Sequence, residues 1–181
     1  IAPIIEEAKI LTLTPSATSD KVTQGFNYMF RTCFTDSYQG KVQAQFAFET
    51  LGCRNAAVLF DGDNEYNTGI AERFKEEFQS FGGTIAIYEG YRAGEQNFSN
   101  QLAKIKQANA DVIILPNYFS DAALQLKQIR SLGINAEIIG CDGWGQDELL
   151  KLGGDAVNGA YFPTFFSPEA DSPVTEEFVK K

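Results

Sequence analysis

Six side chains that could bind a small polar molecule follow short apolar segments of this sequence. They are two hydroxyls, two tyrosines, one carboxylate and one indole, namely Ser16, Thr18, Tyr66, Tyr118, Asp142 and Trp144. Hydroxyls and backbone N–H groups can bind a carboxylate, a carboxylate can pair with an ammonium group, and aromatic rings can cover an apolar tail. We therefore predict that these residues bind a small zwitterion with an apolar tail.

Each of these residues also has a purely structural interpretation. The two hydroxyls could simply close a turn, since Pro and Ser favour turns. The tyrosines could be ordinary half-buried residues, and the tryptophan could belong to the core. Asp142 precedes a glycine, and Asp-Gly is a common turn pair. The binding interpretation depends on all of these groups lying at equivalent strand ends.

The elements that would position these residues alternate between strands and helices. Strands are predicted at 55–61, 84–89, 111–116, 137–142 and 159–166, and helices at 67–83, 97–110, 120–133 and 146–154. Ser120 is the expected N-cap of the third helix. Such alternation predicts an α/β fold with a doubly wound parallel sheet and helices on both faces. In open sheets of this kind, ligands bind beyond the carboxyl ends of the strands.

The two ends of the chain fall outside this repeat. Two further strands, at 10–14 and 28–34, precede a helix at 37–52 and resemble the edge of another sheet. The opening residues read as the back half of a helix, so we expect a fragment of a longer protein. We predict one complete lobe at residues 38–165. Residues 1–37 and 166–181 would be parts of a second lobe.

The composition argues against several classes of function. The net charge is -9 and the pI is about 4.5, which disfavours binding to nucleic acid or to an anionic membrane surface. No apolar run is long enough for a membrane-spanning helix. Histidine is absent, which removes Ser-His-Asp and Cys-His catalysis as well as His-containing zinc sites.

Motifs for cofactors and metals are missing as well. The sequence contains neither a GxxxxGK[ST] phosphate loop nor a GxGxxG fingerprint. The acidic segment DGDNE at 61–65 does not complete a calcium-binding loop. Cys33, Cys53 and Cys141 are far apart, and we expect them to be buried as small hydrophobic residues. We predict no cofactor, no metal site and no catalytic residue.

Six sequence segments, spread over essentially the whole chain, occur in an order that is typical of one protein family. They are LTPSATSDKVTQG, FRTCFTDSYQG, DGDNEYNTGIAERF, GEQNFSNQLAKIKQANADVIILPNY, KQIRSLGI and GCDGWG. This order resembles the solute-binding proteins of branched-chain amino acid ABC transporters, which have the type I periplasmic binding fold. The resemblance implies two α/β lobes around a cleft, with lobe 2 complete and lobe 1 partial in this chain. Hinge crossings would fall near 35–37 and 164–168.

The resemblance also implies roles for the candidate residues. The loop with Ser16 and Thr18 would contact the carboxylate and ammonium of an amino acid. Tyr66 and Tyr118 would approach the ligand from lobe 2, and Asp142 would pair with its ammonium group.

Two residues depart from the family pattern. Asn67 replaces a frequent glycine, which could alter that turn. Trp144 is bulky and could narrow the pocket. A further serine that lobe 1 usually supplies is absent from this chain, so we expect the chain alone to bind weakly or not at all.

The expected function is therefore that of an extracytoplasmic solute-binding component of an ABC importer. Its partners would be an amino acid, branched-chain or otherwise aliphatic, and the permease subunits of the transporter. It would lie in the periplasm or be lipid-anchored at the cell surface. The alternative is a ligand-binding sensor domain of a receptor or an amide-responsive regulator. A nucleotide-dependent enzyme fits less well, because phosphate-binding glycine motifs are missing.

Overall fold

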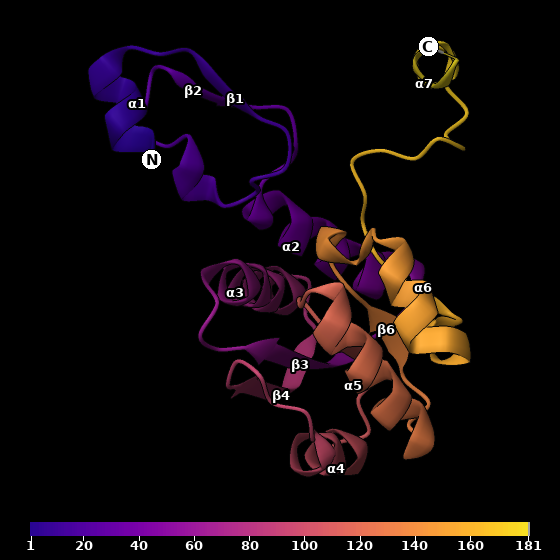
Figure 1. Cartoon of the computed structure of the whole chain (residues 1–181). Coiled ribbons are helices and arrows are strands. Elements are labelled where there is room, and N and C mark those ends of the chain that lie inside the picture. Colours follow the sequence, from indigo (N-terminus) through magenta and orange to yellow (C-terminus); the bar gives the residue numbers. More distant parts are fainter. Residues whose placement is uncertain (181) are drawn as a thin grey trace.

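The computed structural model describes residues 1–180, in which two parallel sheets of different size are flanked by helices (Figure 1). The strands are β1 (Thr12–Thr14), β2 (Met29–Arg31), β3 (Asn55–Asp61), β4 (Thr84–Tyr91), β5 (Val112–Ile114), β6 (Glu137–Ile139) and β7 (Ala160–Tyr161). The helices are α1 (Ala2–Ala8), α2 (Asp36–Gln45), α3 (Glu65–Ser80), α4 (Ser99–Gln107), α5 (Phe119–Ser131), α6 (Asp147–Gly153) and α7 (Pro173–Val179). Shorter helical segments are η1 (Asp20–Val22), η2 (Phe46–Thr50), η3 (Asp142–Trp144) and η4 (Gly154–Val157).

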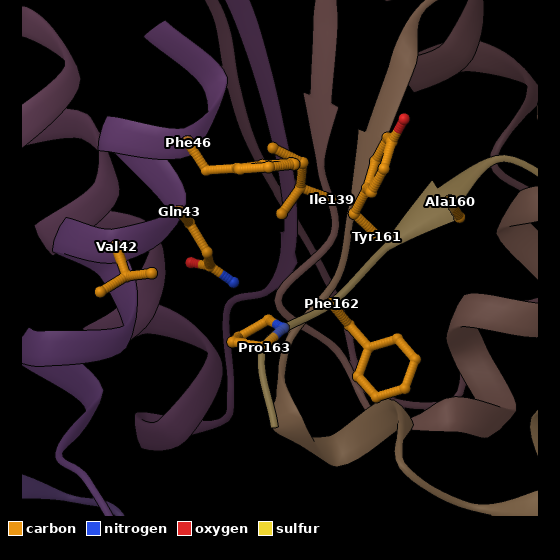
Figure 2. A pocket seen from close by; sticks show the side chains of 8 residues that line it. All are labelled: Val42, Gln43, Phe46, Ile139, Ala160, Tyr161, Phe162 and Pro163. Carbon is orange, nitrogen blue, oxygen red and sulfur yellow. The ribbon is translucent and has the colours of Figure 1, made fainter. Parts of the chain in front are cut away.

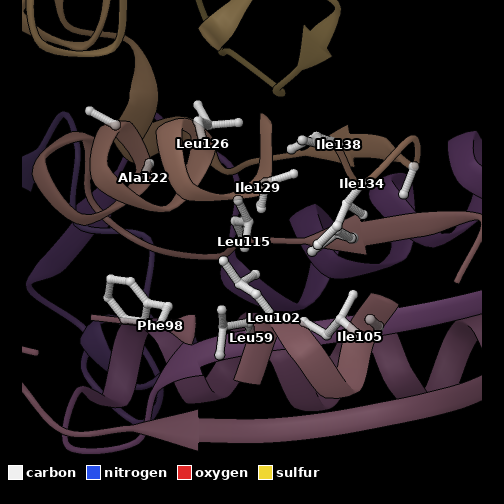
Figure 3. Close-up of a cluster of buried hydrophobic side chains, with 14 of the residues drawn as sticks. Leu59, Phe98, Leu102, Ile105, Leu115, Ala122, Leu126, Ile129, Ile134 and Ile138 are labelled. Carbon is white, nitrogen blue, oxygen red and sulfur yellow. The ribbon is translucent and has the colours of Figure 1, made fainter. Parts of the chain in front are cut away.

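The larger sheet has the strand order β4-β3-β5-β6-β7, and every pair is parallel. Successive side chains of a strand point to opposite faces, and the inner strands β3 and β5 are buried along almost their whole length, so helices cover both faces there. One hydrophobic cluster lies between the sheet and α4, α5 and α6, and includes Leu59, Leu102, Leu115 and Leu126 (Figure 3). The other lies on the face covered by α2 and α3. This arrangement confirms the predicted doubly wound α/β fold.

The strand order places a topological switch point between β3 and β5. The chain leaves β3 for β4 on one side, and then returns past β3 to form β5 on the other side. At such a switch point the two connections diverge, which opens a crevice beyond the carboxyl ends of the strands. The segments that follow β3 and β5, with Tyr66 and Tyr118, begin at this crevice.

The smaller sheet pairs β1 with β2 and lies apart from the larger one, with α1 beside it (Figure 1). Residues 32–35 lead from β2 into α2, and residues 162–172 lead from β7 to α7. Residues 32–35 thus form a first crossing segment, between the part with β1 and β2 and the part with the larger sheet, and residues 162–172 form a second, between the larger sheet and α7. Within residues 1–180, no helix has the length and hydrophobicity needed to cross a membrane.

Two local predictions differ from the structure. The strand predicted at 159–166 contains only Ala160 and Tyr161, because the chain then leaves the sheet for the crossing segment. Ser120 does not cap α5, which begins one residue earlier, at Phe119, with Tyr118 in the N-cap position. The Ser120 hydroxyl instead contacts Asp121 Oδ1 at 3.4 Å.

Helices α2 and α3 approach each other most closely at Gly40. A Cβ atom at this position would lie 2.8 Å from Arg73 Cβ and 2.9 Å from the backbone nitrogen of Phe74. Both contacts involve atoms near the α3 backbone, which cannot move aside as the end of a flexible side chain can. The absence of a side chain at Gly40 therefore allows the close approach of α2 to α3.

We predict opposite effects for two glycine-to-alanine substitutions in these helices. Gly40→Ala should lower the free energy of unfolding by about 1–3 kcal/mol, because it overpacks the helix contact. Gly69→Ala in α3 meets no atom closer than 4.0 Å and should stabilise by up to about 1 kcal/mol through helix propensity. Urea denaturation of both variants tests this, and equal effects would contradict the close-approach interpretation.

Candidate functional site

A cleft of about 560 Å³ opens beyond the carboxyl ends of the larger sheet. Its lining includes five of the six predicted residues, namely Ser16, Thr18, Tyr66, Tyr118 and Asp142. Residues 164–166 of the second crossing segment line it as well. Side chains from both parts of the chain thus meet around one space, as the strand-end argument predicts.

Asp142 is held in this cleft by two hydrogen-bond donors. Its Oδ1 atom accepts a hydrogen bond from Gln39 Nε2 at 2.8 Å and another from the hydroxyl of Tyr66. The backbone N–H of Asp142 donates to Gln39 Oε1 at 2.7 Å. Within residues 1–180, the second carboxylate oxygen, Oδ2, makes no hydrogen bond, so it is available to a ligand.

The two tyrosines form one aromatic surface. The rings of Tyr66 and Tyr118 stack with centroids 5.2 Å apart and an interplanar angle of 25°. Burial raises the pKa of the Tyr66 phenol, and the nearby Cys141 and Asp142 add to this shift. Tyr66 is therefore a neutral hydrogen-bond donor, whereas Tyr118 is 48% exposed and offers its ring to the cleft.

The α3 N-terminus fixes the position of Tyr66. The Asn64 side chain caps the helix by accepting a hydrogen bond from the backbone N–H of Tyr66 at 3.0 Å. Asn and Asp are favoured at this position because a side-chain oxygen satisfies a free backbone donor. The Tyr66 hydroxyl then accepts a hydrogen bond from Gly143 N–H at 3.2 Å, which joins α3 to the loop after β6.

A buried amide, Asn117, ties the two strand ends together beneath the tyrosines. Its Oδ1 atom accepts from the backbone N–H of Asp61 at 3.3 Å and from Asn67 Nδ2 at 3.4 Å. Its Nδ2 atom donates to Gln125 Oε1 at 2.7 Å. Asn67 is thus part of an internal network and is 1% exposed.

The loop with Ser16 and Thr18 is held from behind by one guanidinium group. Arg31 of β2 donates to the backbone carbonyl oxygens of Ala17, Thr18, Ser19 and Asp20 at 2.8–3.3 Å and to the hydroxyl of Thr23 at 2.9 Å. In the resulting conformation Ser16 is exposed, while Thr18 is 4% exposed. A planar group with several fixed donors suits this role, because it can satisfy neighbouring carbonyl groups together.

Asp36, the first residue of α2, contacts this loop from the side of the larger sheet. Its backbone N–H donates to the carbonyl oxygen of Thr18 at 2.9 Å. Burial raises the pKa of Asp36 to about 6. The Thr18 hydroxyl and Arg31 lower the pKa, while Asp142 and Asp20 raise it further.

Trp144 does not line the cleft. Its side chain is 1% exposed and packs under Gly140, where a Cβ atom would lie 2.2 Å from the indole ring. The short helical segment η3 turns the ring inward, toward the cluster on the α5 side of the sheet. This position matches the alternative interpretation of Trp144 as a core residue.

A second pocket, of about 410 Å³, lies between α2 and β7 (Figure 2). Its lining is mostly apolar, with Phe46, Tyr161 and Phe162 among the side chains, and Gln43 is its polar member. It contains no charged group. The cleft at Asp142 is therefore the better candidate for a charged or zwitterionic ligand.

Three residues of the site were missed from the sequence, namely Arg31, Asp36 and Gln39. For two of them a signal existed, since Asp36, Gln39 and Gln43 recur at helical spacing on one face of α2. A polar stripe on the same face as buried alanines indicates specific internal hydrogen bonds. For Arg31, the sequence carries no comparable signal.

The three cysteines lie in the interior of the protein. Cys33, Cys53 and Cys141 are buried and unpaired, as expected. Burial raises the pKa of the Cys141 thiol to about 12, so it is not a nucleophile at neutral pH. Among residues 1–180, no group of three or more His, Cys, Asp or Glu side chains could hold a metal ion.

Comparison with known proteins gives a consistent result. The sequence profile of a family described as "Periplasmic binding protein" matches residues 1–181. The leucine-, isoleucine-, valine-, threonine-, and alanine-binding protein of Pseudomonas aeruginosa is 33% identical over 157 residues, which are 86% of this chain and 42% of that protein. The Leu/Ile/Val-binding protein homolog 1 of Brucella suis is 34% identical over 179 residues, which are 98% of this chain and 48% of that protein.

Solved structures agree with this result. A leucine-binding protein LivK from Thermotoga maritima has a TM-score of 0.93 and 38% identity, covering 99% of this chain and 51% of that one. A branched-chain amino acid transporter substrate binding protein LivJ from Streptococcus pneumoniae, in complex with isoleucine, has a TM-score of 0.90 and 30% identity at the same coverage. The chain thus spans about half the length of the relatives it matches.

We predict that Asp36→Asn changes the pH dependence of stability. The folded-state pKa of about 6 lies above the usual value, so the folded protein binds more protons than the unfolded chain between about pH 4 and 6. The stability that the protonated carboxyl supplies is lost as the pH rises through this range. The asparagine variant should therefore gain about 1–3 kcal/mol relative to wild type between pH 4 and pH 7.5.

Chemical denaturation across this pH range measures the effect. Asp147→Asn, at an exposed position, is the matched control and should follow the wild-type pH curve. Parallel curves for Asp36→Asn and wild type would contradict a raised Asp36 pKa.

Proposed function

The chain belongs to the periplasmic binding protein family, and we propose that it binds an aliphatic amino acid in the cleft for import by an ABC transporter. The names of its relatives, which include leucine-, isoleucine- and valine-binding proteins, support this ligand class. The observation that carries the proposal is the Asp142 carboxylate, which faces the cleft with one free oxygen opposite the loop of Ser16 and Thr18.

The proposed binding mode assigns one part of the ligand to each kind of side chain. The ammonium group pairs with Asp142 Oδ2. The carboxylate lies against the Ser16 hydroxyl and backbone N–H groups of the loop held by Arg31. The apolar tail lies on the stacked rings of Tyr66 and Tyr118, with Phe165 of the crossing segment beside it.

Thr18 has a supporting role in this proposal. Its side chain is 4% exposed and lies beside Asp36, whose pKa its hydroxyl lowers, so Thr18 would act on the ligand mainly through its backbone groups. Trp144 supports the loop of Asp142 from beneath, and its burial argues against direct contact with the ligand.

Each of the two proposed lobes contains one of the two sheets. We propose that residues 1–37 and 166–181 belong to one lobe and residues 38–165 to the other, with the cleft between them. The separate sheet of β1 and β2, and the two crossing segments, support this division. Because the chain spans about half the length of its relatives, ligand binding is properly tested in the full-length protein.

The other parts of the proposal follow from membership of the family. The family and the curated relatives are binding proteins, and we propose that the ligand is bound without chemical conversion. We further propose a location outside the cytoplasmic membrane, in the periplasm or lipid-anchored at the cell surface. The proposed partners are the permease subunits of an ABC transporter.

A thermal-shift screen of the full-length protein against the amino acids tests the ligand class. A ligand that binds only the folded state raises the melting temperature. We expect leucine, isoleucine or valine to raise it, and the double variant Ser16→Ala/Thr18→Ala to show a smaller shift. If no amino acid raises the melting temperature, the proposed ligand class is wrong, although the fold and the family are unaffected.

We predict that Asp142→Asn weakens amino-acid binding in the full-length protein. The change removes the countercharge of the ammonium group, and loss of one partner of a buried charge pair costs about 2–5 kcal/mol. Isothermal titration calorimetry measures the loss, with the exposed Asp147→Asn as control. Unchanged affinity in Asp142→Asn would show that Asp142 is only a turn residue.

A further inference from the structure

Helix α2 turns three polar side chains into the interior of the protein. Asp36, Gln39 and Gln43 are 4%, 1% and 2% exposed, and their spacing of three and four residues places them on one face of the helix. Polar groups are costly to bury unless they are hydrogen-bonded. Gln39 and Gln43 are hydrogen-bonded through their side-chain amides to residues at the cleft or just after β6, and Asp36 is bonded to the cleft loop through its backbone N–H.

The amide of Gln39 contacts one residue at both of its ends. Its Oε1 atom accepts from the backbone N–H of Asp142 at 2.7 Å, and its Nε2 atom donates to Asp142 Oδ1 at 2.8 Å. The backbone donor fixes which way the amide is oriented, because only its oxygen can accept this bond. Together with the Tyr66 hydroxyl, which donates to the same oxygen, Gln39 therefore sets where the carboxylate group of Asp142 points, although it does not line the cleft itself.

The next turn of α2 holds the same strand end at a second point. Gln43 Nε2 donates to the carbonyl oxygen of Gly140 at 2.6 Å, two residues before Asp142. Figure 2 shows the Gln43 side chain projecting from α2 into the space beside β7 and Pro163. Two glutamines one turn apart thus fix the end of β6, and the loop after it begins in one defined orientation.

The first turn of the same helix contacts the opposite side of the cleft. Asp36 N–H donates to the carbonyl oxygen of Thr18, so α2 connects the loop of Ser16 and Thr18 with the loop of Asp142. One helix thus contacts both loops in this structure. Gln39 therefore lies on the element that contacts both loops of the cleft, next to the residue that it binds, Asp142.

We propose that Gln39 is a positioning residue of the ligand site. It holds Asp142 Oδ1 with a neutral donor, so that Oδ2 faces the cleft where the ammonium group of the ligand would bind. This inference rests on the proposed function, because it explains how the residue that binds the ammonium group is oriented. A methionine would fill the same space between α2 and β6 but would leave the Tyr66 hydroxyl as the remaining donor to Asp142 Oδ1, so the carboxylate would be held less firmly.

Three substitutions in the full-length protein test this role. Gln39→Met keeps the side-chain length and removes both hydrogen bonds. Gln39→Glu keeps the shape and the acceptor for Asp142 N–H, but replaces the donor with a negative charge when ionised. Gln45→Met, at an exposed position of the same helix, is the matched control for removing an amide from α2.

The expected results separate positioning from packing. By calorimetry with leucine, isoleucine or valine, Gln39→Met should weaken binding at least about ten-fold, and Gln45→Met should bind as the wild type does. Gln39→Glu should bind poorly at pH 8 and recover as the pH falls toward 5, because a protonated glutamic acid can donate to Oδ1 again. Gln39→Met should show no such recovery.

A double variant supplies the second readout. If Gln39 acts through Asp142, adding Gln39→Met to Asp142→Asn should cause little further loss of affinity, since residues that act as a unit are not additive. Full additivity, or wild-type affinity in both Gln39 variants, would overturn the positioning role while the proposed function stands. A wild-type protein that binds no amino acid would overturn the proposed function and this inference together.

Discussion

Parallel strand pairing is the constraint on which the rest of this structure depends. In a parallel sheet the carboxyl ends of all strands lie at one edge, and helices must return the chain across the faces. Tyr66, Tyr118 and Asp142 are far apart in the sequence, yet each follows a strand of the larger sheet and reaches the same edge. The strand order then decides which of these ends diverge, and it places the crevice between β3 and β5.

Parallel pairing brings the strand ends together, but it does not orient their side chains. Hydrogen bonds from polar groups beside the cleft orient them. These groups are the glutamines of α2, the amide of Asn117 and the guanidinium group of Arg31. Interior polar groups contribute little net stability, and a missing partner makes them destabilising. These groups lie next to the cleft, where their hydrogen bonds orient the loops and side chains that line it.

The sequence alone predicted most of the strands and helices. It also predicted the edge of the sheet at which the candidate ligand-binding residues lie. Hydrophobic patterns reveal buried strands, and strand ends follow from them, so five of six candidates line the cleft. The contact between Gln39 and Asp142 spans 103 positions, and no local pattern shows which residues meet over such a distance. The same limit applies to Trp144, since a turn of three residues decides whether its ring faces the cleft or the core.

The inward position of Trp144 has a practical consequence. It is the one tryptophan among these 181 residues, it is shielded from water, and it lies two residues after Asp142 in η3. An indole in such an apolar environment fluoresces at shorter wavelengths than one in water, and the emission responds to small changes in its surroundings. Trp144 is thus an intrinsic fluorescent probe next to the Asp142 loop. Its emission can report movement of this loop without direct contact between the indole and a ligand.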